Sequence, residues 1–104
     1  MTSLNITISL IGFENNILII ADEVYQDCVY NDSIPFYSFR KVLETMGEPY
    51  KNNVEMISLN SVSKGLLGEC GLRGGYMETH NIDPFVEEMC YKLKSIELCS
   101  NTIG

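Results

Sequence analysis

An unbroken apolar run, Ile17 to Ala21, ends at Asp22 and constrains the fold more than any other segment of this sequence. A short run of this kind predicts a strand that is buried on both faces, as strands are in a parallel sheet. A second short strand is predicted over Val54–Leu59. Strands of this type, separated by helical sequence, are typical of an α/β fold.

A helix is predicted between these strands, over Phe36–Met46, because apolar residues recur there at the spacing of one helix face. Gly47 is placed to end this helix, and Pro49 prevents it from resuming. The preceding segment, Tyr25–Pro35, is mostly polar and is predicted to be a loop.

Three further signals complete the pattern. The alternation in Ile6–Leu10 indicates a strand, and Leu72–Met77 indicates another strand that its glycines weaken. Asn81 or Asp83 is expected to cap a last helix, with Pro84 in its first turn. The expected sheet is mostly parallel, but the chain lacks the elements to cover both faces of its two buried strands. The sequence therefore predicts an incomplete α/β domain with flanking helices.

Composition limits the classes of function that this chain can have. A chain of 104 residues holds one domain at most, and its net charge is -7. Arg40 and Lys41 are its only adjacent cations, so no basic patch predicts binding to nucleic acid. No apolar run approaches the length of a membrane span, and the N-terminus lacks the basic residues of a signal peptide.

Four cysteines indicate the compartment rather than a metal site. Their spacing lacks the close pairs of a zinc site, so no metal ligands are predicted. With this apolar content the chain has little need of disulfides, and we expect reduced thiols in the cytoplasm. The cysteines are Cys28, Cys70, Cys90 and Cys99.

Five side chains with complementary chemistry lie at or after the predicted strands. They are Asp22, Tyr25, Ser61, Lys64 and Arg73. Pyridoxal phosphate presents a ring nitrogen, a ring hydroxyl, an aldehyde and a phosphate, and each of these groups needs a partner. In open α/β sheets, ligands bind beyond the carboxyl ends of the strands, and two of these side chains follow such ends. We therefore expect all five around one concavity.

Each of these residues suits one group of that cofactor. The Asp22 carboxylate would keep the ring nitrogen protonated, and Tyr25 would hydrogen-bond to the ring hydroxyl. Lys64 would bond to the aldehyde, while Ser61 and Arg73 would hold the phosphate. Taken singly, Asp22 is explained equally well as a cap of the next turn, Tyr25 as packing, and the two cations as surface residues. Their order and spacing together favour the cofactor hypothesis.

Three motifs resemble a known family. They are Asp-Glu-Val-Tyr-Gln-Asp at Asp22–Asp27, Ser-x-Ser-Lys-Gly at Ser61–Gly65, and Gly-Glu-Cys-Gly-x-Arg-Gly-Gly-Tyr at Gly68–Tyr76. From about Asn15 to its C-terminus, the sequence closely resembles the alanine subgroup of the class I aminotransferases, which are fold-type I pyridoxal phosphate enzymes. The second motif alone is moderately specific for the superfamily, and the third points to the alanine subgroup.

The resemblance implies a function and a set of roles. It implies a transaminase that moves an amino group between alanine and 2-oxoglutarate, with pyridoxal 5′-phosphate as cofactor and a homodimeric assembly. It makes Lys64 the catalytic residue, because this lysine bonds to the cofactor. The cofactor-binding residues that it implies are Asp22, Tyr25, Ser61, Lys64 and Arg73.

The sequence also departs from the family. Family chains are several times longer, and this one lacks the glycine-rich phosphate loop, the aromatic residue that stacks on the ring and the asparagine that contacts the ring hydroxyl. It also lacks the small C-terminal domain, which contributes the arginine for the substrate carboxylate. Residues 1–104 are thus expected to be a central fragment of the cofactor-binding large domain. The alternative hypothesis is a truncated, non-catalytic fragment or an interaction module.

Overall fold

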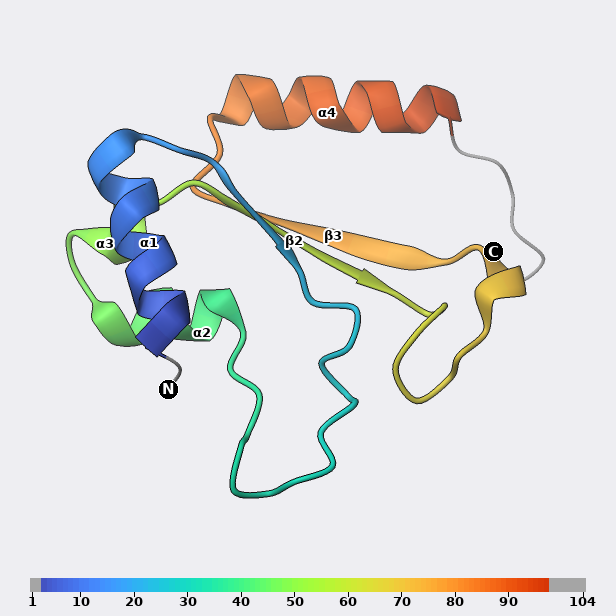
Figure 1. The fold of residues 1–104 in the computed structure, drawn as a ribbon. Helices are drawn as coiled ribbons and strands as arrows, with labels where there is room; N and C mark the ends of the chain where they lie inside the picture. The colour runs from blue at the N-terminus through green and yellow to red at the C-terminus, as the bar shows by residue number, and fades with distance from the viewer. Residues whose placement is uncertain (1–2, 98–104) are drawn as a thin grey trace.

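A three-stranded mixed sheet forms the centre of the structure, a computed structural model that describes residues 3–97 (Figure 1). Its strands are β1 (Ile19–Asp22), β2 (Met56–Ser61) and β3 (Gly75–His80), in the order β1-β2-β3. β1 and β2 are parallel, whereas β2 and β3 are antiparallel. The predicted α/β class and the parallel pairing of the first two strands are confirmed, and the third strand runs the other way.

Helices cover one face of this sheet. The helical elements are α1 (Ser3–Asn15), α2 (Phe39–Met46), α3 (Tyr50–Asn53), a single 3-10 turn (Cys70–Leu72) and α4 (Pro84–Glu97). The first three helices contact one another and pack on the same side, whereas α4 lies apart from them (Figure 1). The described residues thus form a partial two-layer α/β unit.

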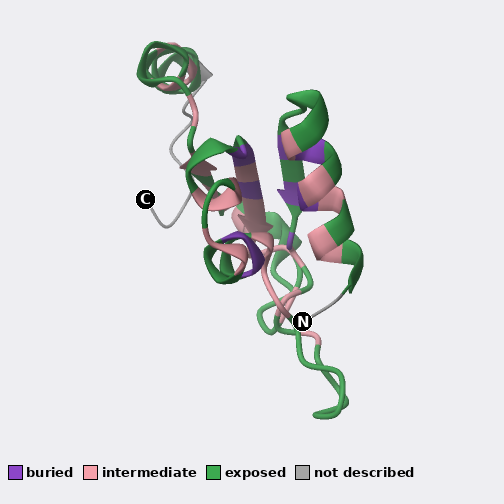
Figure 2. Cartoon of the chain, turned by 90° about the vertical axis from the view of Figure 1, so that its left-hand side faces the viewer, coloured by how far each residue is buried: buried purple, intermediate pink, exposed green. Residues whose placement is uncertain are grey.

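The core lies between the sheet and the three clustered helices. It consists of Ile19, Leu43, Val54 and Met56, which are all buried, together with partly buried side chains from the helices. Figure 2 shows that most of the remaining surface is exposed or intermediate. In β1, Ile19 is buried but Ile20 is 61% exposed, so the described residues cover only one face of this strand. This exposure agrees with the expectation that the chain lacks the elements to cover both faces of its two predicted strands.

The first element corrects another prediction, because Ile6–Leu10 lies within α1 and is not a strand. Apolar side chains occur on several sides of this helix: Ile8 and Phe13 pack against the core, whereas Leu4 is 65% exposed. The sequence therefore shows no clear helical stripe. α1 approaches β1 closely at Gly12, where an added Cβ would lie 3.0 Å from Cδ1 of Ile19. Packing against the sheet thus decides the conformation.

The predicted helix at Phe36–Met46 begins three residues later, at Phe39, because Ser38 caps it. The Ser38 hydroxyl accepts a hydrogen bond from the Lys41 amide at 3.2 Å. Gly47 ends the helix as expected, with a φ of 70° that favours glycine. The single helical turn of α3 was not predicted.

The last helix begins where the sequence indicates. The Asp83 carboxylate accepts hydrogen bonds from the amides of Phe85 and Val86 at 2.9 and 3.3 Å, so Asp83 is the cap. Asn81 has a different role, since its side chain donates to the carbonyls of Lys51 and Val54 and ties the end of β3 to α3.

Candidate functional site

The carboxyl ends of the two parallel strands bring two predicted site residues to one edge of the sheet. Asp22 is the last residue of β1 and Ser61 the last residue of β2. Asp22 pairs with Leu59 in the parallel register, and side chains alternate between faces along a strand. Asp22, Leu59 and Ser61 therefore project from one face, opposite to the face on which Ala21 and Ser58 are buried. That shared face is the one without α1, α2 and α3.

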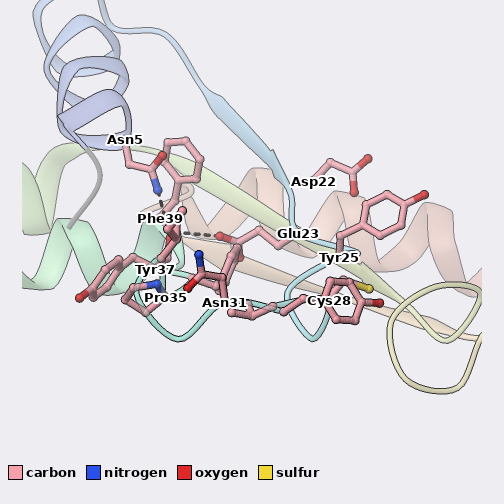
Figure 3. Close-up of a pocket in the computed structure, with 13 residues that line it drawn as sticks. Asn5, Asp22, Glu23, Tyr25, Cys28, Asn31, Pro35, Tyr37 and Phe39 are labelled. Carbon is pink, nitrogen blue, oxygen red and sulfur yellow. Dashed lines mark hydrogen bonds between the residues drawn. The ribbon is translucent and has the colours of Figure 1, made fainter.

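Asp22 and Tyr25 form one part of the candidate site. Both side chains are exposed, and Figure 3 shows them as neighbours beyond the end of β1. The Asp22 carboxylate accepts a hydrogen bond from the Val24 amide, but the distance of 3.4 Å makes this contact weak. The capping interpretation of Asp22 thus accounts for one weak bond and leaves most of the carboxylate open to a ligand.

Ser61, at the end of β2, and Lys64, in the loop that follows β2, form a second part. The Ser61 hydroxyl accepts a hydrogen bond from the Ser63 amide at 3.1 Å and donates to the Gly74 carbonyl at 3.3 Å. Lys64 is exposed, and it has no salt-bridge partner among residues 3–97. Its amine is thus available for a ligand, while the serine helps to shape the loop.

Arg73 lies at the other end of the same loop. Its backbone has a left-handed φ of 52°, and its guanidinium donates to the Cys70 carbonyl at 2.8 Å. One arm of the guanidinium is therefore bound within the loop, and the remaining donors are exposed. The loop is closed by a hydrogen bond from the Val62 amide to the Gly74 carbonyl at 3.1 Å.

The structure divides the five residues rather than placing them around one concavity. Asp22 and Tyr25 line a depression of about 470 Å³, whereas Ser61 and Lys64 line a separate one of about 290 Å³. Arg73 lines neither of them. Within residues 3–97 the five side chains thus do not share one concavity, because the irregular segments that carry most of them are open and bound chiefly within themselves.

A turn from Glu23 to Cys28 forms the wall between the two depressions. Tyr25 faces the first depression, and Asp27 lines the second. Asp27 also lies against Gly65, where an added Cβ would be 3.1 Å from its carboxylate oxygen. Gly65 has a φ of 63°, so glycine fits this position for two reasons. The two motifs that contain Asp22 and Lys64 are thus in contact at this point.

The donor set fits pyridoxal phosphate chemically, although it is split between two depressions. A carboxylate, a phenol, a hydroxyl, an amine and a guanidinium match the ring nitrogen, ring hydroxyl, aldehyde and phosphate. Within residues 3–97, no group of three or more His, Cys, Asp or Glu side chains could hold a metal ion. In the same range, Cys28, Cys70 and Cys90 are free thiols, while Cys99 lies outside the described residues.

Sequence reasoning gave no role to Glu23, which the structure buries beside the site with an exposure of 9%. Its carboxylate accepts hydrogen bonds from the Phe39 amide at 2.8 Å and from the Ser58 hydroxyl at 2.5 Å. One signal was present: alternation along β1 puts Glu23 on the same face as Ala21, where an acid is unexpected.

Tyr30, Glu44 and Lys51 have shifted pKa values. A hydrogen bond with the Cys28 side chain, together with its charge, raises the pKa of Tyr30. A hydrogen bond with Lys51 lowers the pKa of Glu44, and the same bond raises the pKa of Lys51. The pair joins α2 to α3 and is therefore structural.

No helix within residues 3–97 is both long enough and apolar enough to span a membrane.

Comparisons with known proteins agree with the motifs. Residues 10–98 match the model of the family described as aminotransferase class I and II. The chain is 50% identical over 93 residues to alanine aminotransferase 1 of Bos taurus and 54% identical over 91 residues to alanine aminotransferase 2 of Xenopus tropicalis. It is 53% identical over 92 residues to a probable mitochondrial alanine aminotransferase of Dictyostelium discoideum.

These alignments cover most of this chain but little of each relative. They span 89%, 88% and 88% of this chain, and 19%, 17% and 17% of the three relatives. The chain thus spans about a fifth of the length of the proteins that it matches. Since the family match covers most of the described residues and includes both site loops, this chain belongs to the class I and II aminotransferase family.

Proposed function

We propose that this chain supplies the cofactor-binding core of a pyridoxal 5′-phosphate-dependent transaminase that moves an amino group between alanine and 2-oxoglutarate. One observation supports the proposal more than any other: β1 and β2 are parallel, and their last residues, Asp22 and Ser61, lie on the same face of the sheet. Ligands of open α/β sheets bind at this edge. The alanine aminotransferase names of the relatives support the choice of substrates.

Each residue has a task in this proposal. When bound, the cofactor supplies an electron sink for the carbanion chemistry of transamination. Asp22 holds a proton at the ring nitrogen, Tyr25 donates to the ring oxygen, and Ser61 and Arg73 bind the phosphate. Lys64 would hold the cofactor by a covalent bond to its aldehyde carbon until the substrate amine takes its place there, and the Lys64 amine freed by this exchange would move the proton at the substrate α-carbon. Closure of the two depressions into one site is part of the proposal.

The substrates, partner and compartment are proposals as well. An amino acid and a 2-oxo acid would be the substrates, and a homodimer would be the active assembly. A cytoplasmic location is proposed from the free thiols at Cys28, Cys70 and Cys90. The relative from Dictyostelium discoideum is named as mitochondrial, so cell fractionation must decide between these two compartments.

The decisive experiment locates the covalent bond. The longest natural polypeptide that contains this sequence is mixed with an equimolar amount of pyridoxal 5′-phosphate, reduced with borohydride and digested for mass spectrometry. The adduct is expected on Lys64 and should be lost in Lys64→Arg. Lys92→Arg is the matched control, because Lys92 is an exposed lysine paired with Glu88 in α4. An adduct spread evenly over surface lysines would refute the proposal.

A second measurement tests the substrates. Glutamate formed from alanine and 2-oxoglutarate by the loaded polypeptide should exceed that formed from other amino donors. Turnover of alanine no faster than that of a donor such as aspartate would reject the alanine assignment while leaving the cofactor assignment intact.

A further inference from the structure

We propose that Glu23 is a positioning residue of the cofactor site, which holds Asp22 and Tyr25 in place by joining the end of β1 to β2 and to the start of α2. This inference rests on the proposed function, because Asp22 and Tyr25 are the cofactor-binding residues that it serves.

The carboxylate of Glu23 has both oxygens bound. One oxygen accepts from the Phe39 amide at 2.8 Å, at the first residue of α2 (Figure 3), and the other accepts from the Ser58 hydroxyl at 2.5 Å. The residue is 9% exposed, and no Lys or Arg within residues 3–97 forms a salt bridge with it. A buried carboxylate needs such bonds, and the positive end of a helix dipole favours it.

The backbone of Glu23 adds two more bonds. Its amide donates to the Leu59 carbonyl at 3.0 Å, which extends the pairing with β2 beyond the last residue of β1. Its carbonyl accepts from the Gln26 amide at 3.0 Å and so begins the turn that carries Tyr25. Glu23 is therefore bound to three segments: β2, the start of α2, and the turn that follows β1.

The neighbouring site residues have no comparable support. Among residues 3–97, the side chain of Asp22 has one hydrogen bond, the 3.4 Å contact with the Val24 amide, and Tyr25 is 61% exposed. Because side chains alternate, fixing Glu23 on the covered face of the sheet directs Asp22 to the open face. The hydrogen bond from Ser58 also links Glu23 to β2, at a position three residues before Ser61. Glu23 thus connects the two halves of the proposed site through the buried side of the sheet.

Four variants of the same polypeptide test the proposal. Glu23→Ala removes both acceptors, whereas Glu23→Gln keeps an oxygen for the Phe39 amide and offers an amide donor to Ser58. Ser58→Ala removes one bond and changes less of the core. Glu55→Ala is the matched control, since Glu55 is an exposed acid next to β2. The readouts are the dissociation constant for pyridoxal 5′-phosphate and the absorption spectrum of the bound cofactor.

The expected result is a graded loss. Glu23→Ala should weaken cofactor binding at least tenfold and shift the absorption maximum of the bound cofactor, because the partner of the ring nitrogen moves. Ser58→Ala should weaken binding at least threefold, and Glu23→Gln should restore it to within threefold of the parent. If Glu23→Ala fails to fold, the proposal is tested by comparing the cofactor dissociation constants of Ser58→Ala and Glu23→Gln. An unchanged dissociation constant and spectrum in the folded variants would overturn the proposal.

Hydrogen exchange without cofactor separates this proposal from the proposed function. In Glu23→Ala, the amides of Phe39 and Gln26 should exchange at least tenfold faster than in the parent and in Glu55→Ala. If the parent does not bind the cofactor, the proposed function fails. Unchanged exchange at Gln26 in Glu23→Ala or Ser58→Ala would overturn the positioning role by itself.

Discussion

Gly75 offers a sharp test of how the end of β2 is held. It pairs with Ser61 at the end of the antiparallel ladder. A Cβ added to Gly75 would lie 2.5 Å from the Asn60 carbonyl oxygen, closer than the 3.0 Å below which such contacts essentially do not occur. The oxygen belongs to the backbone of β2, so it cannot turn aside as a flexible side chain could. In Gly75→Ala, the strands must therefore separate at this pair.

The cost of this separation follows from overpacking. Forcing an extra methyl group into a filled space costs about 1–3 kcal/mol, and loss of the last ladder bond adds about 1 kcal/mol. Urea unfolding of the intact polypeptide should therefore show Gly75→Ala to be about 2–4 kcal/mol less stable. Movement of Ser61 should also weaken cofactor binding.

The matched control is Gly71→Ala. No atom lies within 4 Å of the Cβ added at Gly71, and its φ is not in the left-handed region. This variant should be neutral or stabilised by up to about 1 kcal/mol, since alanine restricts the unfolded chain. Equal stabilities of the Gly75 and Gly71 variants would refute the close-approach argument.

Three other predictions concern the core, a surface ion pair and catalysis. Leu43→Ala should lower the free energy of unfolding by about 2–5 kcal/mol, because Leu43 is fully buried, whereas Leu66→Ala should change it by less than about 0.5 kcal/mol; equal effects in urea unfolding would contradict the assigned core. Because pairing with Lys51 lowers the pKa of Glu44, the pair stabilises the fold at pH values above the ordinary pKa of 4.5, and this contribution is lost as the pH falls through the lowered pKa. Because the same pairing raises the pKa of Lys51, the pair persists up to pH 10.5 and beyond. Glu44→Gln should thus slightly lower the melting temperature at pH 7, and the difference should shrink as the pH falls further below 4.5; high salt should also reduce it because both side chains are about 40% exposed. The purified 104-residue chain should turn over alanine far more slowly than a full-length transaminase, since its candidate site residues line two separate depressions and so position a substrate poorly; comparable rates would contradict this.

Local signals account for the parts of the fold that the sequence predicted well. The apolar run that ends at Asp22 identified β1, and the parallel pairing with β2 followed from two short apolar strands around a helical segment. Asp83 identified the start of α4, because capping depends on residues that are adjacent in the sequence. Ser38 carries a similar signal for α2, but the apolar pattern placed the start of that helix at Phe36.

The features that were missed depend on contacts between distant residues. The partner of Glu23 on β2 is 35 residues away, and the amide of Phe39 is 16 residues away. The spacing of apolar residues along the sequence does not indicate contacts between such distant residues. α1 was mistaken for a strand because its apolar residues occur on several sides, so only its packing against β1 distinguishes the two conformations. The division of the site into two depressions depends on irregular loops, whose course is set by single hydrogen bonds.

The open face of the sheet leaves apolar side chains in water beside the proposed site. Asp22 and Ser61 project from this face, and Ile20 beside them is 61% exposed. On α4, Phe85 and Ile96 are 67% and 81% exposed. Each large apolar side chain left in water forgoes roughly 1.5–3 kcal/mol of burial, against a typical stability of about 5–15 kcal/mol. A cofactor pocket also needs walls that exclude water, and an apolar face at the site edge is the surface on which such walls would pack. If this apolar face is covered, the measured cofactor affinity reports on the binding residues alone. If the face is exposed, the measured affinity also depends on how much of the protein is folded.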